Sequence, residues 1–286
     1  MKRTTAIAAA LLLAAQPALA DSTRYGLDAD YLYDDNASRG LYGPDRKADN
    51  ILSLQGSATH SMLLGSRSGV VLRAAASYSH FNTFDDLSNL ALTGRAAWRI
   101  QPGTEFYSPF FDIAGNLVWL QHADSELRDG TILTLEASAG SHVTDRVRLG
   151  GGFALEKRDG GGSAGLYDLA TSRFWATLDY RFGVRNTAYA RLMQVAGDHV
   201  FCSLTPGSAL SPVWELDPAL ASGLGRAADC YRLDAKTLLW DIGLNYPLSG
   251  NRALDFALTG YSSKADGSGL KYDGMLLRAS FLYRFQ

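Results

Sequence analysis

Apolar and polar residues alternate along almost the whole chain, and this alternation limits what the chain can fold into. In the segment 50–64, Leu52, Leu54 and Met62 alternate with Ser53, small polar residues and glutamine. A period of two places successive side chains on opposite faces of a β-strand. Twelve such runs, of roughly ten residues each, are recognisable: Arg24–Asp34, Asn50–Leu64, Val70–Phe81, Asn89–Ile100, Phe110–Leu120, Thr131–Gly140, Arg146–Lys157, Ser172–Phe182, Ala188–Ala196, Thr237–Tyr246, Ala253–Ser262 and Tyr272–Phe285.

The connections between these runs alternate between long and short. A long polar segment, DNASRGLYGPDRKAD, follows the first run, whereas only GSRSG follows the second. About ten residues is the length that a tilted strand needs to cross a bilayer, and short turns at one end with long loops at the other are typical of barrels in the outer membrane. The sequence therefore predicts an all-β fold: a transmembrane, antiparallel, up-and-down β-barrel of about twelve strands, with short periplasmic turns and longer extracellular loops.

A soluble antiparallel barrel or sandwich is the alternative, because it also alternates and turns its apolar face into a core. Aromatic residues near the ends of the runs, such as Trp98, Trp119 and Tyr246, favour the membrane barrel, in which such rings gather at the two interfaces.

The first twenty residues have the pattern of a secretory signal. Lys2 and Arg3 precede an Ala/Leu-rich core, and Ala18-Leu19-Ala20 is a small-x-small cleavage site. We expect residues 1–20 to be removed and residues 21–286 to form a single outer-membrane β-barrel domain. Without the leader, 25 basic and 29 acidic side chains remain, which argues against nucleic acid as a partner.

The end of the chain resembles the assembly signal of bacterial outer-membrane β-barrel proteins, in which a terminal Phe follows apolar residues at alternate positions. Leu277, Phe281, Tyr283 and Phe285 carry this resemblance. It implies a porin-like barrel of about twelve strands in the bacterial outer membrane, surrounded by membrane lipid, and the barrel-assembly machinery as a partner of the last strand. Asp34-Asp35-Asn36 is also similar to a pattern in the barrel parts of surface-lipoprotein assembly modifiers and polysaccharide export proteins.

Twelve strands about 4.8 Å apart with a tilt of roughly 40° give a backbone diameter of about 24 Å, so the predicted lumen is narrow. The alternation turns several charged side chains inward near the periplasmic end. These predicted lumen charges are Arg73, Arg99, Arg146, Arg148, Arg181, Arg284, Asp112, Asp179 and Asp255. One interpretation is a basic constriction that favours small anionic solutes, and the other is an ion-paired lumen that braces the wall and conducts little.

The leading hypothesis is therefore a narrow channel for small polar solutes, with small anions as the favoured class. A structural or assembly barrel that helps to export or display a polymer or lipoprotein is the alternative. A hydrolase of envelope lipid comes third, because none of the five histidines has a Ser two residues later, as a catalytic pair on one strand face would require. We predict no enzyme, no catalytic residue, no cofactor and no metal site; Asp45 and Asp49 are expected in a solvated acidic loop rather than around a cation.

The longest connection, Gly197–Cys230, contains both cysteines of the chain. Two cysteines in one excursion of an exported protein predict a disulfide between Cys202 and Cys230. The bridged segment is expected either to fold inward as a plug or to face outward as a contact surface.

Overall fold

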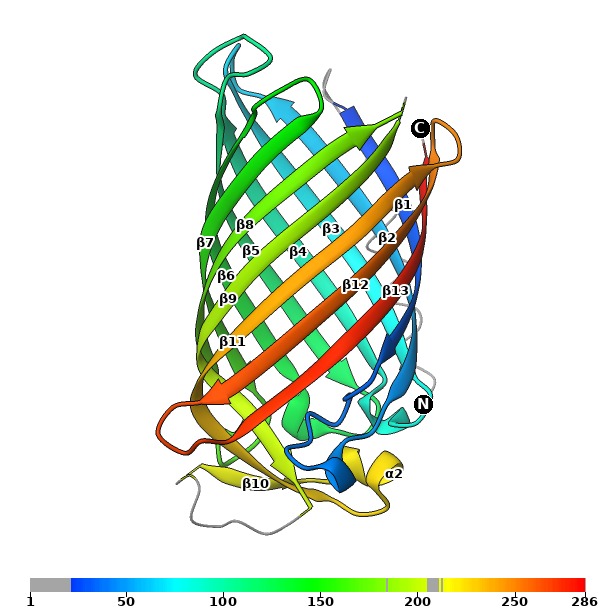
Figure 1. The fold of residues 1–286 in the computed structure, drawn as a ribbon, viewed down its shortest axis with the longest axis vertical. Coiled ribbons are helices and arrows are strands. Elements are labelled where there is room, and N and C mark those ends of the chain that lie inside the picture. The colour runs from blue at the N-terminus through cyan, green and yellow to red at the C-terminus, as the bar shows by residue number, and fades with distance from the viewer. Residues whose placement is uncertain (1–21, 184, 205–210, 212, 286) are drawn as a thin grey trace.

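Twelve long antiparallel strands form the wall of a closed barrel, shown in Figure 1. The computed structural model describes residues 22–183, 185–204, 211 and 213–285, so the predicted leader, Asp21 and Gln286 lie outside the described residues. The wall strands are β1 Ser22–Asp34, β2 Asp49–Leu63, β3 Ser68–Phe81, β4 Asn89–Ile100, β5 Phe110–His122, β6 Gly130–His142, β7 Val147–Gly160, β8 Leu169–Phe182, β9 Asn186–Ser203, β11 Ala228–Pro247, β12 Arg252–Ala265 and β13 Lys271–Phe285.

The barrel closes where the last strand pairs with the first. β13 and β1 are antiparallel from Tyr25 opposite Phe285 to Asp34 opposite Leu276. The predicted assembly-signal residues lie on this strand, and Leu277, Phe281 and Phe285 are exposed on its outer face. Closure leaves no strand edge in the membrane, where an unpaired backbone group would have no water to bind.

Short turns join the strands at one end and long loops at the other, and we name these the periplasmic and extracellular ends by the usual orientation of such barrels. The long loops contain a short strand, β10 Trp214–Asp217, and the small helices η1 Gly43–Asp45, η2 Asp85–Leu87, η3 Glu126–Arg128, η4 Pro218–Leu220 and α2 Ala221–Leu224. No helix among the described residues is long and apolar enough to span a membrane.

Two strands are longer than the sequence indicates. β9 and β11 continue to pair beyond the predicted ends at Ala196 and Thr237, until Ser203 lies opposite Asp229. In this extension Phe201, Cys202 and Tyr231 are buried, because loops cover both faces. The alternation therefore disappears there although the strands continue.

The wall has an apolar outer face and a polar inner face, as the alternation predicts. Leu54, Ile113 and Leu135 are more than half exposed on the outside, whereas Ser57, Thr134 and Ser280 on the inside are buried. This distribution suits lipid outside and polar groups within.

Glycines on the inner face of β7 make room for larger side chains of the neighbouring strand. A Cβ at Gly152 would collide with the ring of Trp175 and would lie 2.7 Å from the carbonyl oxygen of Ala137. Gly150 and Gly152 thus leave space on the inner face for Thr177 and Trp175 of β8.

We predict that Gly152→Val destabilises the barrel, because the added methyl groups have no space between Trp175 and the β6 backbone. A loss of about 1–3 kcal/mol in the free energy of unfolding is expected, measured by urea unfolding of the protein in detergent. Gly94→Val is the matched control, since nothing lies within 4 Å of a Cβ at Gly94. Equal unfolding midpoints for the two variants would contradict this account of the β7 glycines.

Candidate channel and its extracellular cap

Ion pairs between adjacent strands line the periplasmic half of the wall. Arg99 of β4 forms a bidentate pair with Asp112 of β5, with both hydrogen bonds 2.7 Å long. The guanidinium groups of Arg99 and Arg148 each lie 4.7 Å from the centre of the Phe110 ring. Three strands thus hold two cations against one aromatic ring, an arrangement that fixes long side chains along the wall.

The seam of the barrel has its own ion pair. Arg284 of β13 bonds to Asp28 of β1, which also accepts a hydrogen bond from Gln55 of β2. The alternation also turns Asp28 inward, although it lies outside the set of charges predicted for the constriction. The pair joins the first and last strands inside the lumen.

A second cluster surrounds Asp255 of β12. Its carboxylate accepts hydrogen bonds from Arg278 (3.0 Å), Tyr189 (2.8 Å) and Asn245 (3.3 Å). Further from the periplasmic mouth, Arg95 pairs with Glu136, and Arg173 pairs with Glu156. Most of the inward acids are therefore neutralised by an arginine of a nearby strand.

The remaining predicted lumen residues are placed differently. Arg73, Arg181 and Asp179 belong to β3 and β8 and have no ion-pair partner within 4 Å among the described residues. Arg146 lies in the turn that precedes β7 and is exposed, so it is not part of a strand of the wall.

A cavity of about 710 Å³ opens at the periplasmic mouth beside the seam. Three arginines line it: Arg24 of β1, Arg73 of β3 and Arg284 of β13. The hydroxyl groups of Ser57 and Thr59 belong to the same lining. Among the described residues no acidic side chain lines this cavity, so the described lining is polar and carries positive charge.

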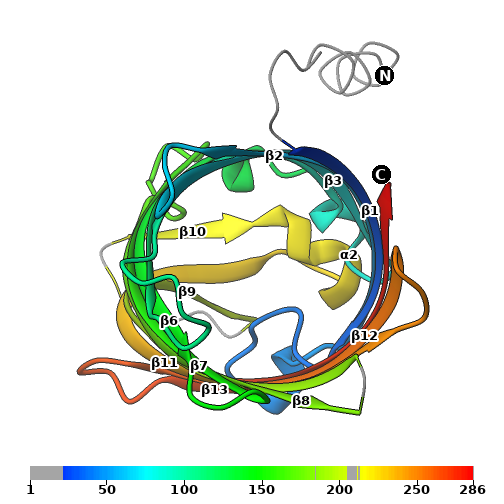
Figure 2. The same ribbon diagram turned by 90° about the horizontal axis from the view of Figure 1, so that it is seen from above.

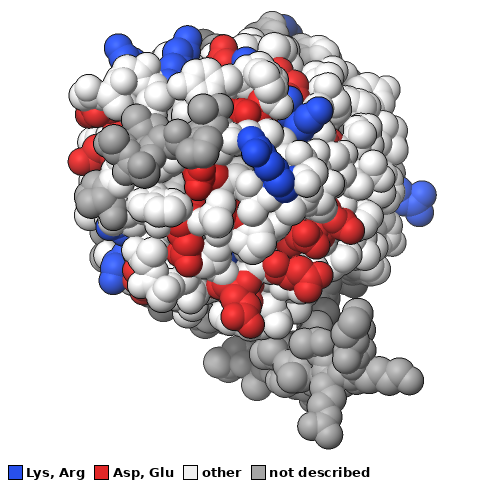
Figure 3. All heavy atoms as spheres, turned by 90° about the horizontal axis from the view of Figure 1, so that it is seen from below, with Lys and Arg blue, Asp and Glu red and all other residues white. Residues whose placement is uncertain are grey.

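The extracellular mouth is covered by loops that pack on one another, which we call the cap: residues 36–45, 84–87, 126–128, 166–167 and 214–230. Figure 2 shows β10 and α2 lying across the barrel at the far end of the lumen. Phe84, Leu166 and Leu220, from three different loops, are fully buried in one apolar cluster. Figure 3 shows this end from outside, with acidic side chains gathered on its described surface.

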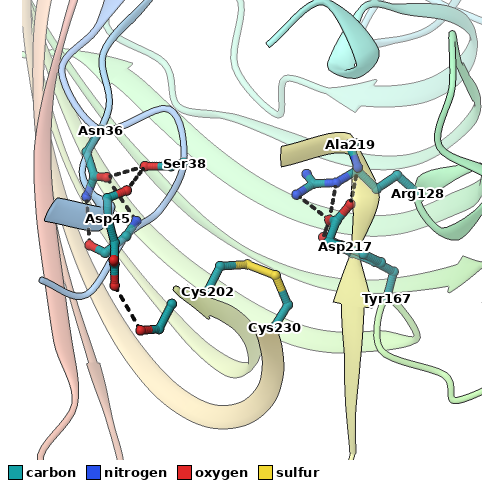
Figure 4. The surroundings of a disulfide bond; sticks show 11 residues. Asn36, Ser38, Asp45, Arg128, Tyr167, Cys202, Asp217, Ala219 and Cys230 are labelled. Atoms are coloured by element: carbon teal, nitrogen blue, oxygen red, sulfur yellow. Dashed lines mark hydrogen bonds and ion pairs between the residues drawn. A yellow bond between two sulfur atoms is a disulfide. The ribbon is translucent and has the colours of Figure 1, made fainter. Parts of the chain in front are cut away.

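Asp217 joins three loops of the cap, as Figure 4 shows. Its carboxylate accepts hydrogen bonds from Arg128 (2.7 Å), from the hydroxyl of Tyr167 and from the backbone N–H of Ala219 (3.1 Å). Asp217 is 0% exposed. A buried carboxylate with three donors and a paired cation is fully satisfied, so the loops are held by a specific interaction in addition to apolar contact.

The electrostatics of this group keep it in one charge state. Burial raises the pKa of Tyr167, and Asp217 adds to this effect, so the hydroxyl remains a donor. Burial alone lowers the pKa of Arg128, but Tyr167 and Asp217 more than offset this, and the pKa lies above its ordinary value. The Arg128 guanidinium therefore stays charged.

The predicted disulfide between Cys202 and Cys230 is present. The two residues lie directly opposite each other on β9 and β11, at the base of the longest loop. Closing a loop of this length stabilises the folded state by roughly 3–4 kcal/mol. The described part of the bridged segment, which contains β10 and α2, lies across the extracellular mouth (Figure 2).

The acidic loop after β1 is not solvated, contrary to the expectation. Asp49 is 1% exposed and accepts hydrogen bonds from the backbone N–H groups of Asn82, Thr83 and Phe84. Asp45 is also buried and accepts a 2.8 Å hydrogen bond from Ser203 of the β9–β11 hairpin (Figure 4). These carboxylates serve as acceptors for neighbouring loops. In the described part of the chain, no group of three His, Cys, Asp or Glu side chains is arranged to hold a metal ion.

One Ser–His contact was not indicated by sequence spacing. His80 Nδ1 lies 3.3 Å from Ser88 Oγ, and the same hydroxyl accepts the N–H of Phe81. Ser88 is buried beneath the β3–β4 loop, where a lipid ester has no access to the hydroxyl. The contact braces the loop.

A closed twelve-stranded wall with an apolar exterior and a charged, polar interior defines a porin-like β-barrel of the outer-membrane type. Among solved structures, an outer membrane channel from Pseudomonas putida F1 is similar over 95% of this chain and 97% of its own, with a TM-score of 0.59 and 12% identity. The KdgM porin aligns over 91% of this chain and 99% of its own, with a TM-score of 0.47 and 9% identity. At this level of identity the first likeness shows a shared fold. No protein-family model matches the chain, and no curated protein is similar to it in sequence.

We predict that Asp217→Ala loosens the cap while the barrel stays folded. Removing the carboxylate leaves Arg128 charged in a buried site, which is expected to cost roughly 3–5 kcal/mol of the free energy that holds the loops together. Amide hydrogen exchange should become faster over residues 214–228 and remain unchanged in β1–β8. Glu126→Gln is the control, because Glu126 is exposed on the same loop as Arg128. Unchanged exchange at 214–228 would show that Asp217 does not hold the cap.

Proposed function

We propose that this protein is a narrow outer-membrane channel for small polar solutes, with small anions favoured at the periplasmic mouth. The observation that carries the proposal is the cavity lined by Arg24, Arg73 and Arg284, in which no described lining residue is acidic. An enclosed polar space with cationic walls lowers the cost of desolvating an anion and raises the cost for a cation.

The paired charges of the lumen set the limits of this preference. Arg99 and Arg278 are neutralised by Asp112 and Asp255, so they contribute polar groups but little net potential. Arg24 and Arg73 line the cavity and have no ion-pair partner among the described residues, so each adds uncompensated positive charge to its wall. Selectivity for anions should therefore depend on these two arginines rather than on the whole set of inward charges.

The cap separates this pathway from the outside. Because Phe84, Leu166 and Leu220 pack together in the cap, we expect solute to pass when the loops move apart. The channel is thus expected to be mostly closed, with brief openings.

We predict that the double variant Arg24→Gln and Arg73→Gln loses anion preference. In planar bilayers under a salt gradient, the anion-to-cation permeability ratio should fall by roughly two-fold or more, since two unpaired cations leave the mouth. Lys157→Gln is the control for a loss of positive charge on the outer face, where Lys157 pairs with Asp159. An unchanged ratio in the double variant, or cation preference in the wild-type protein, would refute the anion-selective mouth.

The second candidate function is a closed barrel that assists export or display of a polymer or lipoprotein, and the loops packed across the mouth favour it. Asp217→Ala distinguishes the two functions. A channel should show more frequent or larger conductance steps once the cap is loosened, and liposomes containing the variant should swell faster in small sugars and organic acids. If neither the wild type nor Asp217→Ala shows conductance steps, although amide hydrogen exchange shows that the cap of the variant is looser, the channel is rejected in favour of the closed barrel.

A further inference from the structure

Three lysines stand in one cross-strand row on the outer face of the barrel. In the pairing register Lys236 of β11 lies opposite Lys264 of β12, and Lys264 lies opposite Lys271 of β13. The sequence contains six lysines, so half of them occupy this single row. The three strands lie side by side in Figure 1, and the row is at their extracellular ends.

Like charges directly opposite each other on adjacent strands destabilise a sheet. Lys236 is partly compensated, since its Nζ lies 3.6 Å from a carboxylate oxygen of Asp266. Lys264 and Lys271 are exposed and have no carboxylate within ion-pair distance among the described residues. The row therefore has uncompensated positive charge, which an anion from outside the chain would relieve.

The outer face below the row becomes apolar within a short distance. Two residues further toward the membrane the same strands present Leu238, Ser262 and Asp273, and after two more they present Trp240, Gly260 and Met275. Four residues correspond to about 13 Å along a strand. An aromatic residue at this position is typical of the membrane interface, so the lysines lie at the level of the lipid headgroups.

A groove of about 300 Å³ runs along the outer face between the lysine row and the apolar residues around Trp240. Leu238, Trp240 and Met275 supply its apolar lining, while Lys271 and Arg46 lie at its polar end. Trp240 lies against Gly260, where a Cβ would collide with the indole ring. Arg46 is held by Asp273, at 2.9 Å, so it adds a positioned donor without adding net charge.

We propose that this surface binds one phosphorylated glycolipid of the outer leaflet, with its phosphate on Lys264 and Lys271 and an acyl chain along the groove. The charge complements a phosphate, for which lysine is a suitable compact cation. The spacing between lysines and Trp240 matches a ligand that has an anionic head and an apolar tail. This inference requires the barrel to lie in the membrane but does not require the lumen to conduct.

Binding of lipid A to the full-length mature protein in a zwitterionic detergent tests the proposal, with native mass spectrometry as the readout. One bisphosphorylated lipid A should bind the wild type, and Lys264→Gln with Lys271→Gln should weaken it by about 30-fold, since each lysine near an anionic surface contributes about five-fold. Lys157→Gln, whose cation is already paired with Asp159, should leave the affinity unchanged. Both variants must first show the heat-dependent gel shift of a folded barrel.

Two further ligands identify the source of the phosphate. Dephosphorylated lipid A should bind at least ten-fold more weakly than the bisphosphorylated form, and phosphatidylglycerol should not displace it at equal concentration. Equal affinity of the double variant and the wild type would overturn the site. Displacement by phosphatidylglycerol, or equal binding of dephosphorylated lipid A, would overturn the assignment to a phosphorylated glycolipid.

Discussion

The pairing of β1 with β13 is the interaction on which the rest of the structure depends. In a bilayer every backbone N–H and C=O must find a partner within the protein, and an open sheet would leave two edges without one. Closure forces the strands to tilt and fixes which face of each strand meets lipid. Once Phe285 faces outward, Arg284 must face inward, and there it meets Asp28 across the seam. The same pairing thus sets both the apolar exterior and the charged interior.

A twelve-stranded wall encloses so little space that inward charges cannot remain far apart. Long arginine side chains along a narrow lumen reach carboxylates on neighbouring strands, as Arg99 reaches Asp112 and Arg278 reaches Asp255. Arg24 and Arg73 are among the exceptions, and they line a cavity at the periplasmic mouth, where the lumen opens. Positive potential is therefore concentrated at the periplasmic mouth, because the wider lumen there keeps these arginines away from carboxylates.

The period-two alternation was sufficient to predict the architecture, because a closed barrel imposes one rule on all of its strands. It placed Arg73, Asp112 and Asp255 on inward positions without knowledge of any contact. It could not predict the cap, in which Arg128 and Asp217 are 89 residues apart and come from irregular loops. Apolar and polar residues do not alternate in such loops. They do not alternate at the ends of β9 and β11 either, where loops cover both faces, so these ends were missed. Only the two cysteines carried a signal there, since an exported chain favours their pairing.

The chain uses its two basic residue types in different environments. Arginine lines the lumen, where a planar guanidinium can form two hydrogen bonds to one carboxylate or lie on an aromatic ring, as around Phe110. Lysine is absent from the inward positions of the described strands and is concentrated where β11, β12 and β13 leave the membrane. A lysine head is strongly hydrated and keeps a long flexible stem, so it suits a wet interface with mobile anions better than a crowded wall. The interior is thus built for fixed partners within the protein, and the row at Lys264 is suited to a partner that the membrane supplies.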